Sequence, residues 1–358
     1  MTPKADRTAR YREMRDFSKT PEPKGQAADG DQGLRFVIQQ HDATRLHWDL
    51  RLEHDGALAS WALPRGLPWT PDENHLAVHT EDHPLEYLTF HGEIPEGEYG
   101  AGSMFIWDEG TYEAEKWEEK KVTVTLRGER AKGKYALFQT RGRDWMIHRM
   151  DPPQDPDRRP VPRDLRPMRP SPGKLPSKPD QHAFELRWPG ARALILGEVG
   201  RPDIVSANGA DIGPHFPEIR RISRALGSRE VVLDCVIVAV RSGTPLPDAG
   251  HVEHRLSVTS DSSFRRLTDT EPVAAMLVDL LWLDGHPVVD QPWEERRDLL
   301  EDLGLEAEAW QTPSAHRGDG AALLEAAKEA GMPGLVAKKV DSPYRPGSQT
   351  RDWIEISA

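Results

Sequence analysis

The sequence contains one cysteine, Cys235, so it can form no internal disulfide and no zinc site built from several cysteines. We expect this cysteine to act as a small buried apolar side chain. The chain also lacks any apolar run of membrane-spanning length, and its first residues, MTPKADRTARYREMRDF, are polar and charged where a secretory signal would be apolar. A cytoplasmic protein with no membrane partner is therefore expected.

A surplus of positive charge is missing as well. The sequence has 47 Lys and Arg against 59 Asp and Glu, which gives a formal net charge of −12. This balance argues against a general basic coat of the kind that attracts nucleic acid over a whole surface. Any nucleic-acid partner would have to be bound by a local cluster of Arg, Lys and His.

The 358 residues are enough for two ordinary domains. Residues 1–33 show little periodicity and are expected to form a mobile polar arm that can partly dock. Residues 34–150 contain short runs such as LRFVIQQ, HLAVHT and KVTVTL, separated by turn residues. That pattern is typical of an all-β barrel or sandwich.

The second half of the chain has a different composition. Residues 151–182 are dense in Pro and Arg with almost no aliphatic periodicity, which predicts a semi-extended linker. In residues 183–358, strand-like runs such as VVLDCVIVAV alternate with helix-like stretches such as PWEERRDLLEDL. The sequence thus indicates a multi-domain protein whose second domain mixes α and β structure.

The segment LHWDLRLE combines strict alternation with residues that carry chemistry. Successive side chains of a strand point to opposite faces, so His47, Asp49 and Arg51 share one face. His41 lies just upstream, close enough to fold over the start of this strand. Imidazoles and a carboxylate suit manganese or zinc, and an arginine beside them can clamp a phosphate. The pattern favours phosphoryl chemistry.

A second polar cluster, HTEDHP followed by Tyr87, offers another imidazole, a phenol and the carboxylates of Glu81 and Asp82. These groups could contact a phosphate or move protons. The alternative is that LHWDLRLE has an ordinary solvated face and that these acids are surface charge. The glycine-rich GEIPEGEYGAG fits no nucleotide-binding fingerprint, so hairpin turns are its expected role.

The motifs HDATRLHWDLRLEHDG, SWALPRGLP, TEDHPLEYLTFHGEIPEGEYGAG and DWMIHR resemble the 3′-phosphoesterase module of bacterial DNA ligase D, over nearly all of residues 11–150. The resemblance implies an all-β barrel in which manganese, or another divalent ion, is held by His41, His47 and Asp49. It further implies catalytic roles for Arg51, Glu81, His83 and Tyr87. His75 stands where some members carry a phosphate-binding arginine, so it becomes a candidate phosphate contact.

The function that this resemblance implies is metal-dependent removal of a 3′-phosphate or a 3′-ribonucleotide from nucleic-acid ends during DNA repair, most simply end joining. The expected partners are DNA or mixed RNA/DNA 3′ ends, together with a separate ligase or end-joining proteins. During repair the protein would associate with the nucleoid. The alternative is a non-catalytic scaffold that binds DNA ends, and His75 is the residue that favours it.

The motifs FELRWPGARALI, LVDLLWLDG, GLVAKKVDSPYRPG and RDWIEIS resemble, in this order, the α+β adenylation (nucleotidyltransferase) domain of ATP-dependent DNA ligases, over roughly residues 165–358. That family links AMP to a lysine, but Arg187 stands there and a guanidinium does not lose its proton in proteins. Other functional groups of the family's motifs are replaced at Pro189, Ala207, Val236, Pro333, Glu355 and Ser357. We therefore expect an inactive adenylation-like domain with no use of ATP, against the alternative of a working ligase.

Overall fold

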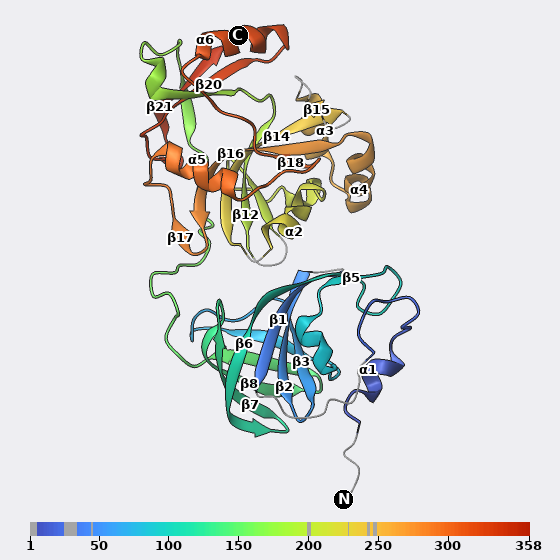
Figure 1. The fold of residues 1–358 in the computed structure, drawn as a ribbon. Helices are drawn as coiled ribbons and strands as arrows, with labels where there is room; N and C mark the ends of the chain where they lie inside the picture. Colours follow the sequence, from blue (N-terminus) through green and yellow to red (C-terminus); the bar gives the residue numbers. More distant parts are fainter. Residues whose placement is uncertain are drawn as a thin grey trace, which may run out of the picture. The chain divides into compact units, whose positions relative to one another are not determined.

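The computed structural model describes residues 6–24, 34–43, 46–198, 202–227, 229–241, 244–245 and 249–358. The chain divides into two compact units, Met1–Pro156 and Asp157–Ala358 (Figure 1). No described helix is both long enough and apolar enough to cross a membrane.

The first unit is an antiparallel β-barrel. Eight strands follow one another in the order β1-β2-β3-β4-β9-β8-β7-β6, and β6 pairs with β1 to close the ring. A short ninth strand, β5, pairs with β6 outside this ring. The strands are β1 (Arg35–Asp42), β2 (Leu46–His54), β3 (Ala57–Leu63), β4 (Asn74–His79), β5 (Gly92–Ile94), β6 (Gly102–Glu118), β7 (Lys121–Gly128), β8 (Lys132–Arg141) and β9 (Asp144–Arg149). The barrel that the resemblance implied is confirmed.

Local sequence explains the hairpin that carries His47, Asp49 and Arg51 of the expected site. Asp55 and Gly56 join β2 to β3 with positive φ angles of 52° and 82°, the conformation that a two-residue hairpin turn requires. One face of β2 places Trp48 and Leu50 in the apolar interior, where both are almost completely buried. The opposite, polar face is buried as well, because other segments cover it. It is therefore not a solvated face.

Part of the N-terminal arm covers that face. Residues 6–24 include the short helix α1 (Ala9–Glu13), and Tyr11 from this helix is fully buried in an apolar cluster with Val37, Leu58 and Tyr87. Tyr87 belongs to the 3-10 helix η1 (Leu85–Thr89). The described part of the arm is therefore docked on the barrel, and the sequence had led us to expect a mobile polar arm that can partly dock. Residues 1–5 and 25–33 of the expected arm lie outside the described residues.

The structure also differs from the expectation of a linker over residues 151–182. The second unit begins at Asp157, and β10 (Arg169–Pro172) pairs in parallel with β21 (Gln349–Ser357). Val161 and Met168 are buried in the core of this unit. Proline is compatible with an edge strand, where the missing N–H is not needed for pairing. The sequence did not predict this packing, because Val161 and Met168 are isolated apolar residues without periodicity.

The second unit has two sheets. The first has the order β10-β21-β20-β11-β19, and the second has the order β13-β12-β14-β16-β17, with β15 paired to β14 and β18 to β16. Their remaining strands are β11 (His182–Leu186), β12 (Ala191–Gly197), β13 (Asp203–Ser206), β14 (Val231–Arg241), β15 (Thr244–Pro245), β16 (Val273–Leu283), β17 (His286–Pro287), β18 (Trp310–Gln311), β19 (His316–Arg317) and β20 (Gly334–Lys339).

Helices complete the second unit and confirm its mixed α and β character. They are α2 (Ile222–Leu226), α3 (Gly250–Ser257), α4 (Asp261–Thr270), α5 (Trp293–Asp302) and α6 (Gly320–Glu329), with the 3-10 helices η2 (Pro179–Gln181), η3 (Gly213–His215) and η4 (Ile219–Arg221). The largest apolar cluster combines β14 and β16 with residues of α2, α3 and α5. Cys235 is a fully buried, free cysteine in this cluster, as expected.

Candidate active site

Two imidazoles and a carboxylate meet at the β1–β2 hairpin. His41 on β1 lies directly opposite His47 on β2, and Asp49 follows two residues later on the same face. The ligand atoms of these three side chains all lie within 4.8 Å of one another. His41 Nδ1 and His47 Nε2 each lie 3.7 Å from a carboxylate oxygen of Asp49. This mixed nitrogen and oxygen set suits a divalent ion such as Mn²⁺.

The ring of His41 is oriented by the backbone. Its Nε2 atom lies 2.9 Å from the carbonyl oxygen of Gly100. A carbonyl can only accept, so Nε2 carries the proton and the lone pair lies on Nδ1, the atom near Asp49. Metal-binding histidines are commonly held in this way, with the second ring nitrogen donating to the protein. The hairpin thus presents His41 in the tautomer that a metal ion requires.

Arg51 lies beside the three candidate ligands and is 2% exposed. Its guanidinium donates to Gln39 Oε1 at 2.6 Å, to Ser60 Oγ at 3.1 Å and to Asp49 Oδ2 at 2.8 Å. Burial alone would raise the pKa of Asp49, but the charge of Arg51 holds that pKa well below its usual range. Asp49 is therefore ionised and able to bind a cation at neutral pH.

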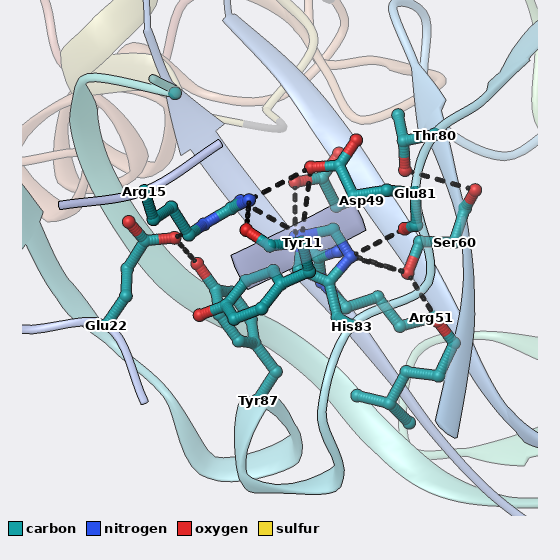
Figure 2. Close-up of polar contacts among 12 residues, drawn as sticks. Tyr11, Arg15, Glu22, Asp49, Arg51, Ser60, Thr80, Glu81, His83 and Tyr87 are labelled. Atoms are coloured by element: carbon teal, nitrogen blue, oxygen red, sulfur yellow. Dashed lines mark hydrogen bonds and ion pairs between the residues drawn. The ribbon is translucent and has the colours of Figure 1, made fainter. Parts of the chain in front are cut away.

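The docked arm brings a second guanidinium to the site. Arg15 Nε donates to Glu22 Oε1 at 2.7 Å, and Arg15 Nη1 donates to Glu81 Oε1 at 3.2 Å. Figure 2 shows Arg15 and Glu22 from the arm lying next to His83 and Tyr87 from the barrel. The Arg15 and Glu22 side chains are almost fully buried, so these pairs are well shielded from water.

His83 occupies the space between the two arginines. Its Nδ1 atom lies 2.9 Å from the carbonyl oxygen of Glu81, and its Nε2 atom lies 3.4 Å from Arg15 Nη2. Nδ1 therefore donates and Nε2 accepts, which is the pattern of a neutral ring. Burial, followed by the positive charges of Arg51 and Arg15, holds the pKa of His83 well below its ordinary value. The geometry and the pKa thus agree on a neutral imidazole.

Tyr87 is fully buried and its hydroxyl donates to Glu22. The Arg51 guanidinium carbon lies 4.7 Å from the centre of the Tyr87 ring, at cation–π distance. Burial raises the pKa of the Tyr87 hydroxyl well above its usual range, so this group stays protonated. Tyr87 therefore links the arm to the barrel through its hydroxyl, while its ring packs against the guanidinium of Arg51.

These groups line a cavity of about 320 Å³. It brings together seven of the residues expected from the sequence, His41, His47, Asp49, Arg51, Glu81, His83 and Tyr87. Arg15 and Tyr99 also line it. Among the described residues, the Oε2 atom of Glu81 is buried without a hydrogen-bond partner, so it remains free to accept one.

His75 is not among the residues that line this cavity. It lies on β4 and is 4% exposed. Its Nδ1 atom lies 2.9 Å from the carbonyl oxygen of Gly66, and its Nε2 atom lies 3.3 Å from Glu73 Oε1. These contacts give His75 a structural role in holding the segment between β3 and β4. Contact with a substrate phosphate stays a prediction.

Several residues of the site were missed by the sequence analysis. Arg15, Glu22 and Tyr11 come from the arm, and Gln39 and Ser60 orient Arg51. The available signal in the arm was the pair of aromatic residues, Tyr11 and Phe17, in a charged segment. Gln39 shares a strand face with His41, so alternation of the LRFVIQQ run could have placed it near the candidate metal ligands.

In the second unit, a cavity of about 160 Å³ is lined by Arg187, Lys338, Trp353 and Glu355, among other residues. Arg187 Nη2 lies 2.9 Å from Glu355 Oε1, so the residue at the expected nucleophile position forms an ion pair. Lys338 is 1% exposed and lies 2.9 Å from a carboxylate oxygen of Glu185. Its amine also donates to the carbonyl of Val278 at 2.6 Å.

Two family models match this chain, one in each unit. Residues 39–139 match the family model of the DNA ligase D 3′-phosphoesterase domain, and residues 171–356 match that of the ATP-dependent DNA ligase domain. The chain thus combines a phosphoesterase-type barrel with a ligase-type α+β domain. It belongs to the family of ATP-dependent DNA ligases, with the domain pair of DNA ligase D.

Similar proteins include the multifunctional non-homologous end joining protein LigD of Mycolicibacterium smegmatis, which is 41% identical over 99% of this chain and 46% of that protein. LigD of Pseudomonas aeruginosa is 30% identical over 99% of this chain and 47% of that protein. The chain therefore spans about half the length of these relatives. A solved structure of mycobacterial DNA ligase D complexed with ATP and MES matches 54% of this chain and 60% of its own at 29% identity, with a TM-score of 0.44.

Proposed function

We propose that the first unit is a metal-dependent 3′-phosphoesterase that removes a 3′-phosphate or a 3′-ribonucleotide from nucleic-acid ends, in DNA repair by end joining. The observation that carries this proposal is the single cavity in which His41, His47 and Asp49 lie beside Arg51 and His83. The relatives named for end joining and the matched 3′-phosphoesterase model support the substrate class.

The metal would be held by His41, His47 and Asp49, because their donor atoms fit a divalent ion and His41 already has its lone pair on the correct nitrogen. Manganese is the ion that we propose, and other divalent ions can bind the same mixed donor set. A bound ion of this kind withdraws negative charge from a phosphate oxygen and so makes phosphorus more open to attack.

The chain's own residues then have separate roles. Arg51 and Arg15 line the cavity, and their positive charge stabilises the charge that develops on the phosphate oxygens. Tyr87 and Glu22 keep these two guanidinium groups in place. The free Oε2 atom of Glu81 can accept a proton from the attacking water.

For the second unit we propose a non-catalytic role with no use of ATP. Arg187 cannot act as the nucleophile of adenylation, because its guanidinium does not lose a proton in proteins. Glu355, which forms an ion pair with Arg187, carries a negative charge at the position where the ligase motif has a lysine that contacts the triphosphate.

The proposed partners are DNA or RNA/DNA 3′ ends and a separate ligase or end-joining proteins. The proposed location is the cytoplasm, with nucleoid association during repair.

A primer-template with a 3′-phosphate or one 3′-ribonucleotide tests the function directly. Purified protein with MnCl₂ is expected to release phosphate or shorten the primer, and a chelator is expected to stop the reaction. His47→Ala should abolish both the activity and Mn²⁺ binding by calorimetry, whereas alanine at His91, an exposed histidine outside the cavity, should leave both intact. Binding of the same DNA without any release would favour the scaffold alternative.

A further inference from the structure

Tyr99 lies in the connection between β5 and β6 and is unlike the other tyrosines of the cavity region. It is 44% exposed, whereas Tyr11 and Tyr87 are fully buried. Its side chain nevertheless lines the same cavity as the candidate metal ligands. An aromatic ring that is open to solvent at the edge of a phosphate-binding cavity is available to a substrate.

The backbone holds Tyr99 close to the metal ligands. The next residue, Gly100, accepts the hydrogen bond from His41 Nε2 at 2.9 Å. Ala101 N donates to Glu98 O at 3.1 Å, which closes the turn around Tyr99. Gly102 has a φ of +142°, and a Cβ atom there would lie 2.3 Å from the carbonyl oxygen of Asp42. The connection therefore passes against β1, and the position of Tyr99 is coupled to that of His41.

Tyr99 lies where charged and apolar groups of the cavity lining meet. The guanidinium carbon of Arg15 lies 5.3 Å from the centre of the Tyr99 ring, so the ring borders a charged group. Ile94 and Met104 also line the same cavity and are apolar. This lining combines a positive charge, which suits a phosphate, with an aromatic ring, which suits the flat base of the nucleotide that carries the phosphate.

We propose that Tyr99 is a specificity-determining residue that stacks on the base of the 3′-terminal nucleotide. The inference rests on the proposed 3′-phosphoesterase function and adds the contact that recognises the nucleoside. Stacking on an aromatic ring is tolerant of sequence, because every base presents a π face. The terminal base is also the one that most easily leaves the end of a duplex to reach such a ring.

Two substrates test the stacking contact. One primer carries a normal base on its 3′-phosphorylated terminal nucleotide, and the other carries an abasic tetrahydrofuran at that position. Wild-type protein with Mn²⁺ should have a kcat/KM about tenfold higher on the base-bearing primer, the preference expected for one stacking contact. Tyr99→Ala should lose this preference and Tyr99→Phe should keep it. Phe105→Ala is the matched control, because Phe105 is 58% exposed but does not line the cavity.

A second readout does not depend on hydrolysis. A terminal 2-aminopurine should be quenched on binding to wild type and Tyr99→Phe, and should stay bright with Tyr99→Ala. Quenching without any phosphate release would support the stacking contact and overturn the proposed hydrolytic function. Release of phosphate with no difference between the two primers, or with quenching that persists in Tyr99→Ala, would overturn the stacking contact alone.

Discussion

Arg51 shows why the identity of one side chain matters in this site. Its guanidinium donates in separate directions to Gln39, Ser60 and Asp49, so its rigid fork orients Asp49, a proposed metal ligand, while Arg51 also lines the cavity. Lysine has the same charge but is a flexible point charge with no planar fork. The proposed phosphate contact and the orientation of Asp49 both depend on that geometry.

Replacing Arg51 with lysine should therefore lower kcat/KM for 3′-phosphate release by about 100-fold, since the loss of two charge-assisted hydrogen bonds is of this order. The measurement is steady-state release from a short 3′-phosphorylated oligonucleotide. Arg127→Lys is the matched control, because Arg127 and its partner Glu113 are both largely exposed. A near-normal rate for Arg51→Lys would remove Arg51 from the phosphate-binding groups.

His83 gives a prediction about pH. Burial and two arginines lower the pKa of this histidine in the folded protein, so the unfolded chain binds a proton below about pH 6.5 that the folded chain does not. Stability should therefore fall as the pH decreases from 6.5 towards 5. In His83→Gln the loss should be smaller, by up to about 1.4 kcal/mol per pH unit. Urea unfolding at several pH values measures it, and equal slopes for both proteins would contradict it.

Strand alternation was enough to predict that His47, Asp49 and Arg51 share a face, because side chains in any regular strand alternate. The same reasoning did not predict that His41 would lie directly opposite His47, since that depends on the pairing register. Arg15 was missed for a different reason. It contacts Glu81, 66 residues further along the chain, through tertiary packing, which has no local pattern.

The docked part of the arm makes contacts that the sequence did not predict. Its helix α1 is only five residues long and could not be stable alone in water. Tyr11 holds it on the barrel through apolar packing, and Arg15 adds buried ion pairs to Glu22 and Glu81. Packing therefore orders a segment whose composition is that of a solvated arm. The edge strand β10 is a second segment that the sequence did not predict. Its proline content indicated a linker, but it pairs with β21.

Arg15→Ala should impair both stability and activity. Removing one partner of a buried ion pair leaves an uncompensated charge, which costs about 3–5 kcal/mol. The expected result is a lower midpoint of urea unfolding and an increased KM for the 3′-phosphorylated primer. Arg12→Ala, three residues earlier in the same arm but with a partly exposed side chain, should change both much less. Equal effects of the two changes would mean that the arm contributes nothing specific to the site.

The second unit keeps the framework of an adenylation domain and rearranges the charges in its cavity. Arg187 pairs with Glu355, and Lys338 is held by Glu185 and a backbone carbonyl. The pKa of Lys338 is lowered by burial, although the carboxylate of Glu185 opposes this effect. A lysine that is engaged in this way is not placed as a free nucleophile. The two units therefore differ: the proposed catalytic groups of the first meet in one cavity, whereas the charged groups in the cavity of the second pair with one another.

Restoring a single lysine should not restore adenylation. The Arg187→Lys protein would have a possible nucleophile, but Glu355 would still repel the triphosphate, and Pro189 and Val236 would still lack carboxylates to position the nucleotide and its metal. Incubation with ATP labelled at the α-phosphate should therefore label neither wild type, nor Arg187→Lys, nor Arg187→Lys with Pro189→Asp. An active ATP-dependent DNA ligase provides the positive control.

The free energy of unfolding should change by less than about 1 kcal/mol in Arg187→Lys, because the Arg187–Glu355 pair is about one-third exposed. Label in the wild-type protein, with mass spectrometry locating it on Lys338 or another residue, would show that the second unit still uses ATP. Label in Arg187→Lys but not in wild type would show that Arg187 alone blocks the reaction, and label only in the double variant would show that Arg187 and Pro189 block it together.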